Sequence, residues 1–153
     1  MADPTELPSQ ADPKEAAGVA NRLVEAGQGG AMVKLIGLEY LELAADRVVA
    51  RIPVAPNTQP YGLLHGGATA ALCETIGSMG TALAVGLERI VTGIELNVNH
   101  LRAVRAGHVT ATGTPLHLGR TTAVWDMQVH DDEGRLVAVG RLTLVIRDAP
   151  SGQ

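Results

Sequence analysis

The residues that could do chemistry gather in positions 61–80, YGLLHGGATAALCETIGSMG, where a histidine and two glycines precede a run of small and apolar residues. Glu74 is the only charged residue between Gly66 and Val85. Glycine at the start of a helix lets a ligand approach the backbone N–H groups, and the helix dipole favours negative charge there. A carboxylate two turns further along could then attack a carbonyl carbon whose oxygen gathers that charge. The alternative is an ordinary exposed helix glutamate.

A helical wheel for residues 66–84 separates Glu74 from the apolar side of the predicted helix. Leu72, Ile76, Met79 and Leu83 fall together and predict the stripe that a sheet would cover. Glu74 lies roughly opposite and shares its face with Ser78, four residues on. The other residues on that side are all small, namely Gly67, Ala70, Ala71 and Thr81. This face is suited to close approach by a ligand or a partner surface.

The elements that must position this helix read as strands of an antiparallel sheet. Residues 89–101, 107–118, 121–131 and 135–147 are β-branched and alternating, and DDEG between the last two predicts a hairpin. Residues 33–56 predict two extended segments that turn near Ala45 and Asp46, and residues 13–26 predict a short helix. The layout β-β-α-β-β-β-β predicts an α+β fold with the sheet folded onto one face of the long helix.

Composition narrows the class of protein. The 153 residues, 46% of them apolar, suit one domain over residues 14–149, with residues 1–13 as a mobile tail. The net charge of −4 and the absence of a basic block argue against a nucleic-acid partner. We find no signal peptide and no apolar stretch of membrane-spanning length, so we expect a cytoplasmic protein without a membrane partner. The single cysteine, Cys73, excludes an intrachain disulfide, and we expect no metal site.

The segment QPYGLLHGGATAALCETIGS (59–78) resembles the hot-dog-fold acyl-CoA thioesterases, in particular the branch that contains 4-hydroxybenzoyl-CoA thioesterase. The similarity continues through GIELNVNHLRAV, GHVTATGTPLHLGRTT and DDEGRLVAVGRLTL, and covers roughly residues 32–147. The resemblance implies an antiparallel sheet wrapped around one long central helix. It also implies an acyl-CoA substrate, with CoA as part of the substrate and no separate cofactor.

The resemblance assigns roles to five residues of the motif. Glu74 matches the carboxylate that attacks the thioester carbonyl or activates a water. Gly66 matches the residue whose N–H polarises the thioester oxygen, and Gln59 a side chain that supports the same carbonyl. His65 matches a histidine that orients the carbonyl or assists the leaving thiolate, with a capping role as the alternative. Ser78 matches a residue that holds the water or Glu74, and a serine that bonds back to its own turn is the alternative.

The resemblance also places the CoA phosphates, at Arg102 and at the turn formed by Gly119, Arg120 and Thr121. Ala103 stands where the family often has proline, so the loop beside Arg102 departs from the pattern. Three further histidines lie on predicted strands without ligand spacing and are interpreted as structural: His100, His108 and His117. Cys73 points away from Glu74 on the wheel, which argues against a Cys-His nucleophile.

In the resembled family the carboxylate comes from one subunit and the HGG loop from another. We therefore expect a homodimer at least, often paired again into a tetramer, with the active site at the subunit interface. The first hypothesis is hydrolysis of acyl-CoA thioesters carrying aryl or medium-length hydrophobic acyl groups. The second is an acyl-CoA-binding sensor without catalysis, and the third is a hydratase, whose Asp/His arrangement we do not find near the helix.

Overall fold

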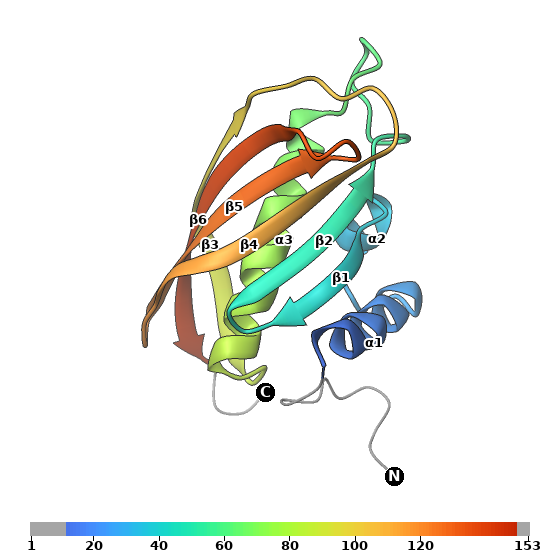
Figure 1. Ribbon diagram of the computed structural model, residues 1–153. Helices are drawn as coiled ribbons and strands as arrows, with labels where there is room; N and C mark the ends of the chain where they lie inside the picture. Colours follow the sequence, from blue (N-terminus) through green and yellow to red (C-terminus); the bar gives the residue numbers. More distant parts are fainter. Residues whose placement is uncertain (1–11, 150–153) are drawn as a thin grey trace.

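The computed structural model describes residues 12–149, whose strands form one antiparallel sheet that curves around a long helix (Figure 1). The strands lie in the order β1-β2-β4-β5-β6-β3. In chain order the elements are α1 (Pro13–Glu25), α2 (Ala31–Leu35), β1 (Glu39–Ala44), β2 (Arg47–Pro53), α3 (Gly66–Val85), β3 (Arg89–His100), β4 (His108–Leu118), β5 (Thr122–Asp131) and β6 (Leu136–Asp148). The predicted α+β fold, with the sheet around one long helix, is confirmed.

Two sequence-based expectations for the N-terminal region need correction. The extended segment expected from Val33 begins as the short helix α2, and strand β1 starts only at Glu39. Gly30, with a φ of 90°, precedes this helix, and Val33 is buried, so the five residues form one turn that packs an apolar side chain inward. The expected tail, residues 1–13, lies outside the described residues as far as position 11. Asp12 caps α1 through its side chain, and Pro13 begins that helix.

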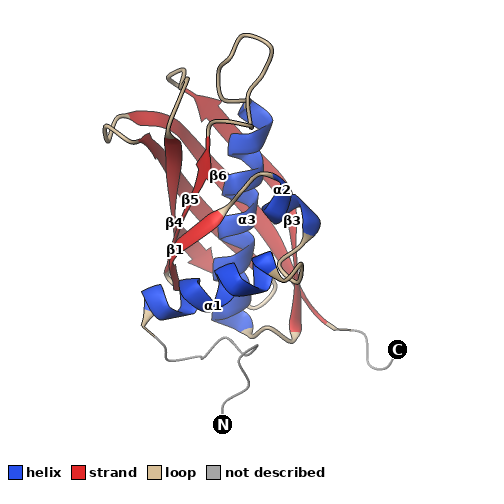
Figure 2. Cartoon of the chain, turned by 90° about the vertical axis from the view of Figure 1, so that its right-hand side faces the viewer, coloured by secondary structure: helices blue, strands red, loops and turns tan. Residues whose placement is uncertain are grey.

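Helix α1 covers one edge of the sheet. The Asn21 side chain donates to the carbonyl of Tyr40 (2.9 Å) and accepts from the N–H of the same residue (2.8 Å), so it occupies backbone groups of β1. The ladder between β1 and β2 is also irregular between Tyr40 and Glu42. Figure 2 shows α1 lying across the lower part of the molecule, in front of the sheet. An edge with occupied groups and a bulge is protected from pairing with another strand.

The face of α3 on which the sheet packs overlaps the one the wheel predicted but is rotated from it. Leu72 and Ile76 are buried as expected, but so is Thr81, which was placed with Glu74. The Trp125 indole N–H donates to the Thr81 hydroxyl (2.8 Å), and a Cβ at Gly80 would overlap the indole ring. The largest buried side chain of the sheet, Trp125, therefore packs where α3 carries glycine instead of a larger residue. This rotates the buried face away from Met79 and Leu83, which stay half-buried.

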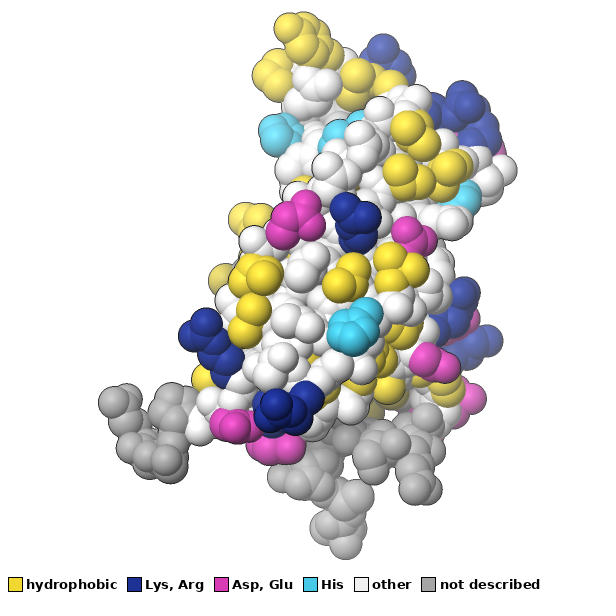
Figure 3. Space-filling view, turned by 90° about the vertical axis from the view of Figure 1, so that its left-hand side faces the viewer, with side chains coloured by type: hydrophobic (Ala, Val, Ile, Leu, Met, Phe, Trp, Pro, Cys, Tyr) yellow, Lys and Arg dark blue, Asp and Glu magenta, His cyan; other side chains and the backbone are white. Residues whose placement is uncertain are grey.

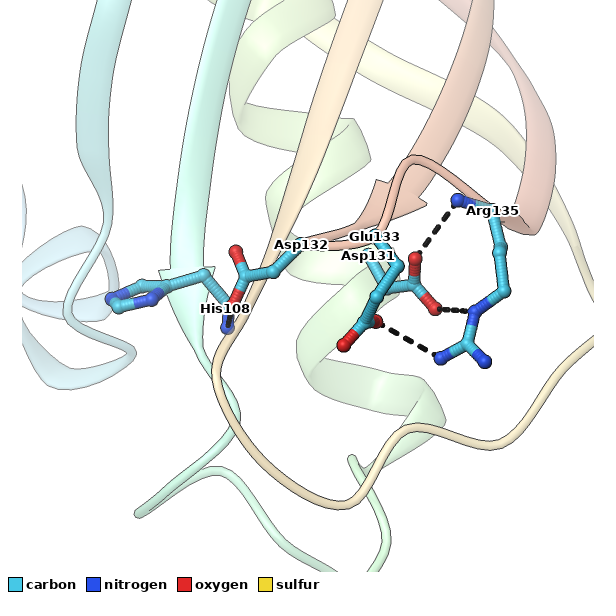
Figure 4. Close-up of polar contacts among 5 residues, drawn as sticks. All are labelled: His108, Asp131, Asp132, Glu133 and Arg135. Carbon is cyan, nitrogen blue, oxygen red and sulfur yellow. Dashed lines mark hydrogen bonds and ion pairs between the residues drawn. The ribbon is translucent and has the colours of Figure 1, made fainter.

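The predicted hairpin between β5 and β6 is confirmed. The turn is held by Arg135, whose Nε contacts a carboxylate oxygen of Asp131 at 2.7 Å and whose backbone N–H donates to the other (2.8 Å) (Figure 4). Burial would raise the pKa of Asp131, but these bonds outweigh it and the pKa is lowered. Asp132 accepts the N–H of His108 at 2.9 Å and so ties the turn to the start of β4. The acids and arginine of this hairpin are thus structural.

Of the helices described in residues 12–149, α3 alone is long and apolar enough to meet the length and composition of a membrane span. The expectation that no apolar stretch has membrane-spanning length is corrected for this helix. In the fold α3 buries eight residues, including Leu72, Cys73 and Ile76. A helix enclosed by its own sheet has this composition because it supplies the core.

Candidate active site

Two cavities flank α3, and five of the nine predicted site residues divide between them. The first, which we call the donor cavity, has a volume of about 350 Å³ and lies at the start of the helix, where Gln59, Gly66 and Arg102 line it. The second, the carboxylate cavity, has a volume of about 420 Å³ and lies beside the second half of the helix, where Glu74 and Ser78 line it. No residue that lines one cavity also lines the other.

The first turn of α3 leaves one backbone donor free. His65 is the N-cap residue, and its Nδ1 accepts the N–H of Gly67 at 2.8 Å. The N–H groups of Ala68 and Thr69 point back to the carbonyl of His65. Within residues 12–149 no acceptor bonds the N–H of Gly66, which lines the donor cavity. A free N–H at the positive end of a helix is suited to binding a developing oxyanion.

This geometry gives His65 the capping role that the sequence left open as the alternative. Its ring nitrogen acts as an acceptor, so in this arrangement Nδ1 carries no proton. A side chain at Gly67 would meet that nitrogen at 2.9 Å, so the second glycine of HGG gives the cap its room. By holding the helix start in this form, His65 decides which N–H remains available.

Gln59 reaches the donor cavity from a loop that is fastened at several points. The Asn57 amide donates to the carbonyls of Ile36 (2.7 Å) and Pro53 (2.9 Å), and the carbonyl of Asn57 accepts from the N–H of His65 (2.8 Å). The N–H of Gln59 donates to the carbonyl of Leu63 at 2.8 Å. These bonds fix the half-buried Gln59 on the same wall as Gly66.

His100, which the sequence analysis interprets as structural, lines the donor cavity and is a further candidate site residue. It is exposed at the end of β3 and lines the donor cavity with Gly66. A Cβ at Gly66 would lie 2.8 Å from its Nε2, so the imidazole packs directly on the helix start. Glycine at position 66 is therefore required for this close approach. His108 and His117 line neither cavity.

Glu74 is half-buried and lies against β3. A side chain at Gly93 would collide with the Glu74 carboxylate, so that glycine makes room for it. Within residues 12–149 no cation or hydrogen-bond donor is paired with Glu74, and burial raises its pKa above the ordinary value. A partly desolvated carboxylate with no partner is a stronger base and a more reactive nucleophile than one on an open surface.

Ser78 lies one turn beyond Glu74 in the same cavity, as the wheel predicted. Thr75 and Thr81 donate back to the carbonyls of Ala71 (2.7 Å) and Gly77 (2.8 Å), but among the described residues Ser78 makes no such bond. Its hydroxyl can therefore hold a water or a ligand. Cys73 is buried on the core side, where desolvation raises its thiol pKa to about 12, so it stays protonated.

The residues expected to bind CoA phosphates do not meet within one chain. Exposed Arg102 lines the donor cavity beside Ala103. The turn of Gly119, Arg120 and Thr121 joins β4 to β5 beside the last residues of β6, where the N–H of Ile146 donates to the Thr121 carbonyl (2.9 Å). That end of β6 lies away from Val137 and Ala138, which line the donor cavity. A phosphate role for the turn stays a prediction.

The proposed oxyanion donor, Gly66, and the carboxylate, Glu74, are also too far apart to meet within one chain. Gly66 and Glu74 are eight residues apart, which corresponds to about 12 Å along a helix. Reacting atoms must come within about 3–3.5 Å of each other. A carbonyl bound at the Gly66 N–H is thus out of reach of Glu74 in the same chain.

Comparison with known proteins identifies relatives of this chain. Residues 61–138 match the family described as the thioesterase superfamily. The chain is 42% identical over 118 residues to the 1,4-dihydroxy-2-naphthoyl-CoA hydrolase of Escherichia coli, covering 76% of this chain and 87% of that one. It is also 42% identical over 118 residues to the proofreading thioesterase EntH of Cronobacter turicensis, covering 76% and 86%. A crystal structure of a Haemophilus influenzae thioesterase superposes with a TM-score of 0.80 at 34% identity, covering 97% of this chain and 99% of that one.

Proposed function

The chain belongs to the thioesterase superfamily and is a thioester hydrolase, and from that premise we propose that it cleaves acyl-CoA to the free acid and CoA with Glu74 at the reacting carbon. The observation that carries the proposal is that one helix bears both a free Gly66 N–H and a partly desolvated Glu74 carboxylate without a partner. These are the two groups that hydrolysis of a thioester needs, an oxyanion donor and a nucleophile or base.

Two routes conserve atoms and charge. In the first, the Glu74 carboxylate attacks the carbonyl carbon, CoA leaves as a thiolate, and water hydrolyses the resulting anhydride. In the second, Glu74 removes a proton from a water that attacks the same carbon, and that proton passes to the leaving thiolate. The unbonded Ser78 hydroxyl suits the second route, because it can hold the attacking water one turn from Glu74.

We further propose that the working site is shared between two copies of the chain. One copy supplies Gly66 and Gln59, and the other supplies Glu74 and Ser78, because one chain keeps these pairs in different cavities. Strand β3 offers the surface for such an association. It is twelve residues long, lies at the edge of the sheet, and exposes Ile94 (61%) and Ile90 (43%). Figure 3 views the side that lies to the left in Figure 1, where hydrophobic side chains are exposed among charged ones.

The acyl group is proposed to be aryl or medium-length and hydrophobic. The walls of the carboxylate cavity are largely apolar, with Val33, Met79 and Val91 among its lining residues. The E. coli relative is named for a naphthoyl-CoA substrate, which is consistent with a cavity that accepts a ring. A cytoplasmic location is part of the proposal and suits a chain whose one cysteine is an unpaired, buried thiol.

Release of free thiol from a panel of aromatic and aliphatic acyl-CoAs tests the proposal. Buried Cys73 gives little background with thiol reagents. Glu74→Ala is expected to lower kcat by about 10²–10⁴-fold with the fold intact. Glu25→Ala, which removes an exposed carboxylate at the end of α1, is the matched control. Near-normal turnover by Glu74→Ala would exclude Glu74 as the reacting group, and acyl-CoA binding without thiol release would favour the sensor hypothesis.

A further inference from the structure

The carboxylate cavity continues beyond Glu74 as a trough between α3 and β3. Helix α3 contributes Glu74, Ser78 and Ala82, which are four residues apart and share one face. Strand β3 contributes Arg89 and Val91, which alternate along its half-buried face. The trough therefore has a helical wall and a strand wall that run side by side.

Glu74 marks one end of this trough and Arg89 marks the other. The Glu74 carboxylate lies against Gly93, and Arg89 precedes Gly93 by four residues on β3. Four strand residues span about 13 Å. On the opposite wall Glu74 and Ala82 are eight helical residues apart, or about 12 Å. An acyl group whose carbonyl carbon lies at Glu74 thus runs about 12 Å before it meets Arg89.

Between these ends the trough is mostly apolar. Val33 of α2, Met79 and Leu87 line it, and Gly29 adds no side chain to the wall. Tyr40 also lines it, and burial raises the pKa of this phenol to about 12, so it is neutral at any physiological pH. The body of a hydrophobic acyl group fits such walls. For a negatively charged group, the one cationic side chain among the lining residues is Arg89, at the far end.

The Arg89 guanidinium is available for a ligand. Its Nε lies 3.0 Å from Asp148 and 3.4 Å from the carbonyl of Arg147, and none of its Nη groups is bonded within residues 12–149. The side chain of Asp148 is 89% exposed, whereas that of Arg89 is only 24% exposed. An ion pair with so exposed a partner contributes little and is readily exchanged. The planar guanidinium can then bind an oxygen anion through two N–H groups.

We propose that Arg89 selects acyl groups that carry an oxygen acceptor, above all a carboxylate, at the end remote from the thioester. This inference rests on the proposed hydrolase function and names the substrate class for the same cavity. Arg89 is a specificity-determining residue in this assignment, because it lies far from the carbon that reacts. Its contact is made equally in the ground and transition states, so it acts on KM more than on kcat.

Two acyl-CoAs of equal length test the proposal, octanoyl-CoA and suberyl-CoA, which differ by a terminal methyl or carboxylate. The wild-type enzyme is expected to have the lower KM for suberyl-CoA. Arg89→Met keeps an unbranched, largely apolar stem and removes the guanidinium, and is expected to raise the KM for suberyl-CoA about ten- to a hundredfold. The KM for octanoyl-CoA is expected to stay within about twofold, since apolar contacts remain. ω-Hydroxyoctanoyl-CoA, a neutral acceptor, should fall between the two.

The matched control is Arg141→Met, which removes an exposed arginine of β6 that lines neither cavity. Equal loss on both substrates, or no preference in the wild-type enzyme that still turns over octanoyl-CoA, would overturn the inference and leave the proposed function standing. A lack of thiol release from every acyl-CoA would overturn both.

A second variant keeps the proposal testable if Arg89→Met fails to fold. Asp148→Asn leaves the arginine in place and removes the carboxylate that competes for it. The KM for suberyl-CoA is then expected to fall severalfold, with octanoyl-CoA unchanged. A KM that rises or stays constant for suberyl-CoA would contradict an anion site at Arg89.

Discussion

The two cavities on α3 differ in the charge that they would present to a thioester carbonyl. The donor cavity presents groups that favour negative charge, namely the free N–H of Gly66, the guanidinium of Arg102 and the His100 imidazole. The carboxylate cavity presents a negative charge itself, on Glu74, among mainly apolar walls. The dipole of one helix explains part of this contrast. Its positive end favours an oxyanion at Gly66, whereas Glu74 lies mid-helix, out of reach of that end, and has its pKa raised by burial.

Each cavity therefore lacks what the other supplies. The donor cavity can stabilise an oxyanion but has no carboxylate among the residues that line it, and the carboxylate cavity has the carboxylate but no helix N-terminus. Two chains related by a twofold axis would bring unlike cavities together twice. If the working site is shared as proposed, each chain supplies one half of each of two sites.

The largest effect should come from blocking strand β3. Replacing its exposed Ile90 and Ile94 with lysine places like charges along an edge that is open for pairing. We expect a folded monomer without measurable thioesterase activity, as judged by sedimentation and thiol release. Met32→Lys with Leu35→Lys changes exposed apolar residues of α2 in the same way and should leave assembly intact. A fully active monomer would contradict the shared site, since one chain would then hold a complete site.

Next in size is the loss of the Gly66 donor. Gly66→Pro removes the N–H at the first helical position, where proline is tolerated, and His65 before it is already extended. Loss of one oxyanion donor should lower kcat by about 10²–10³-fold. Gly66→Ala keeps the N–H but adds a Cβ that overlaps His100, so it measures how much of the loss in kcat is steric. Equal rates for the two variants would mean that the N–H does not act.

A smaller effect, but a sharper test, is recovery in mixed assemblies. Glu74→Gln and Gly66→Pro subunits, expressed together with different tags and purified through both, should regain up to about half of wild-type turnover per dimer, because one of the two shared sites is intact. Each parent alone should stay nearly inactive. Mixed assemblies that are no more active than the parents would show that each chain uses its own Gly66 and Glu74.

The smallest effect concerns stability. The raised pKa of Glu74 means that the folded protein binds this proton more tightly than the unfolded chain, so the carboxyl favours folding below its ordinary pKa of 4.5 and loses that contribution as pH rises. Glu74→Gln should therefore be more stable than wild type at neutral pH. The gain should be below about 1 kcal/mol, because the half-exposed group is screened by solvent, and should vanish near pH 4. Urea unfolding across pH measures it, and a gap that widens in acid would contradict the burial of Glu74.

Several parts of the site could be predicted from the sequence because they depend on neighbours along the chain. The spacing of Glu74 and Ser78 puts them on one helical face wherever the helix lies. The HGG motif predicts a helix start at which a ligand can approach a backbone N–H, because glycine has no side chain to block it. Alternation in the later segments predicted four strands, and the hairpin at residues 131–135 was found from its turn residues.

Other parts were missed because they depend on contacts between distant segments. Thr81 was placed on the open face, since nothing in the local pattern says that Trp125, far along the chain, packs against the glycines of α3. His100 was interpreted as structural for the same reason. It reaches Gly66 only because β3 returns alongside α3 and ends at the start of that helix.

The sequence by itself determined which chemical groups the helix carries, because a period of 3.6 residues fixes their relative directions before any packing occurs. Only the tertiary structure decided that Gly66 and Glu74 open into different cavities, that Gly93 lies against the acid, and that Arg89 lines the same cavity as the acid. Side-chain directions on one helix follow from local geometry. The choice of strand that faces them follows from long-range packing around Trp125, which fixes how the sheet sits on α3.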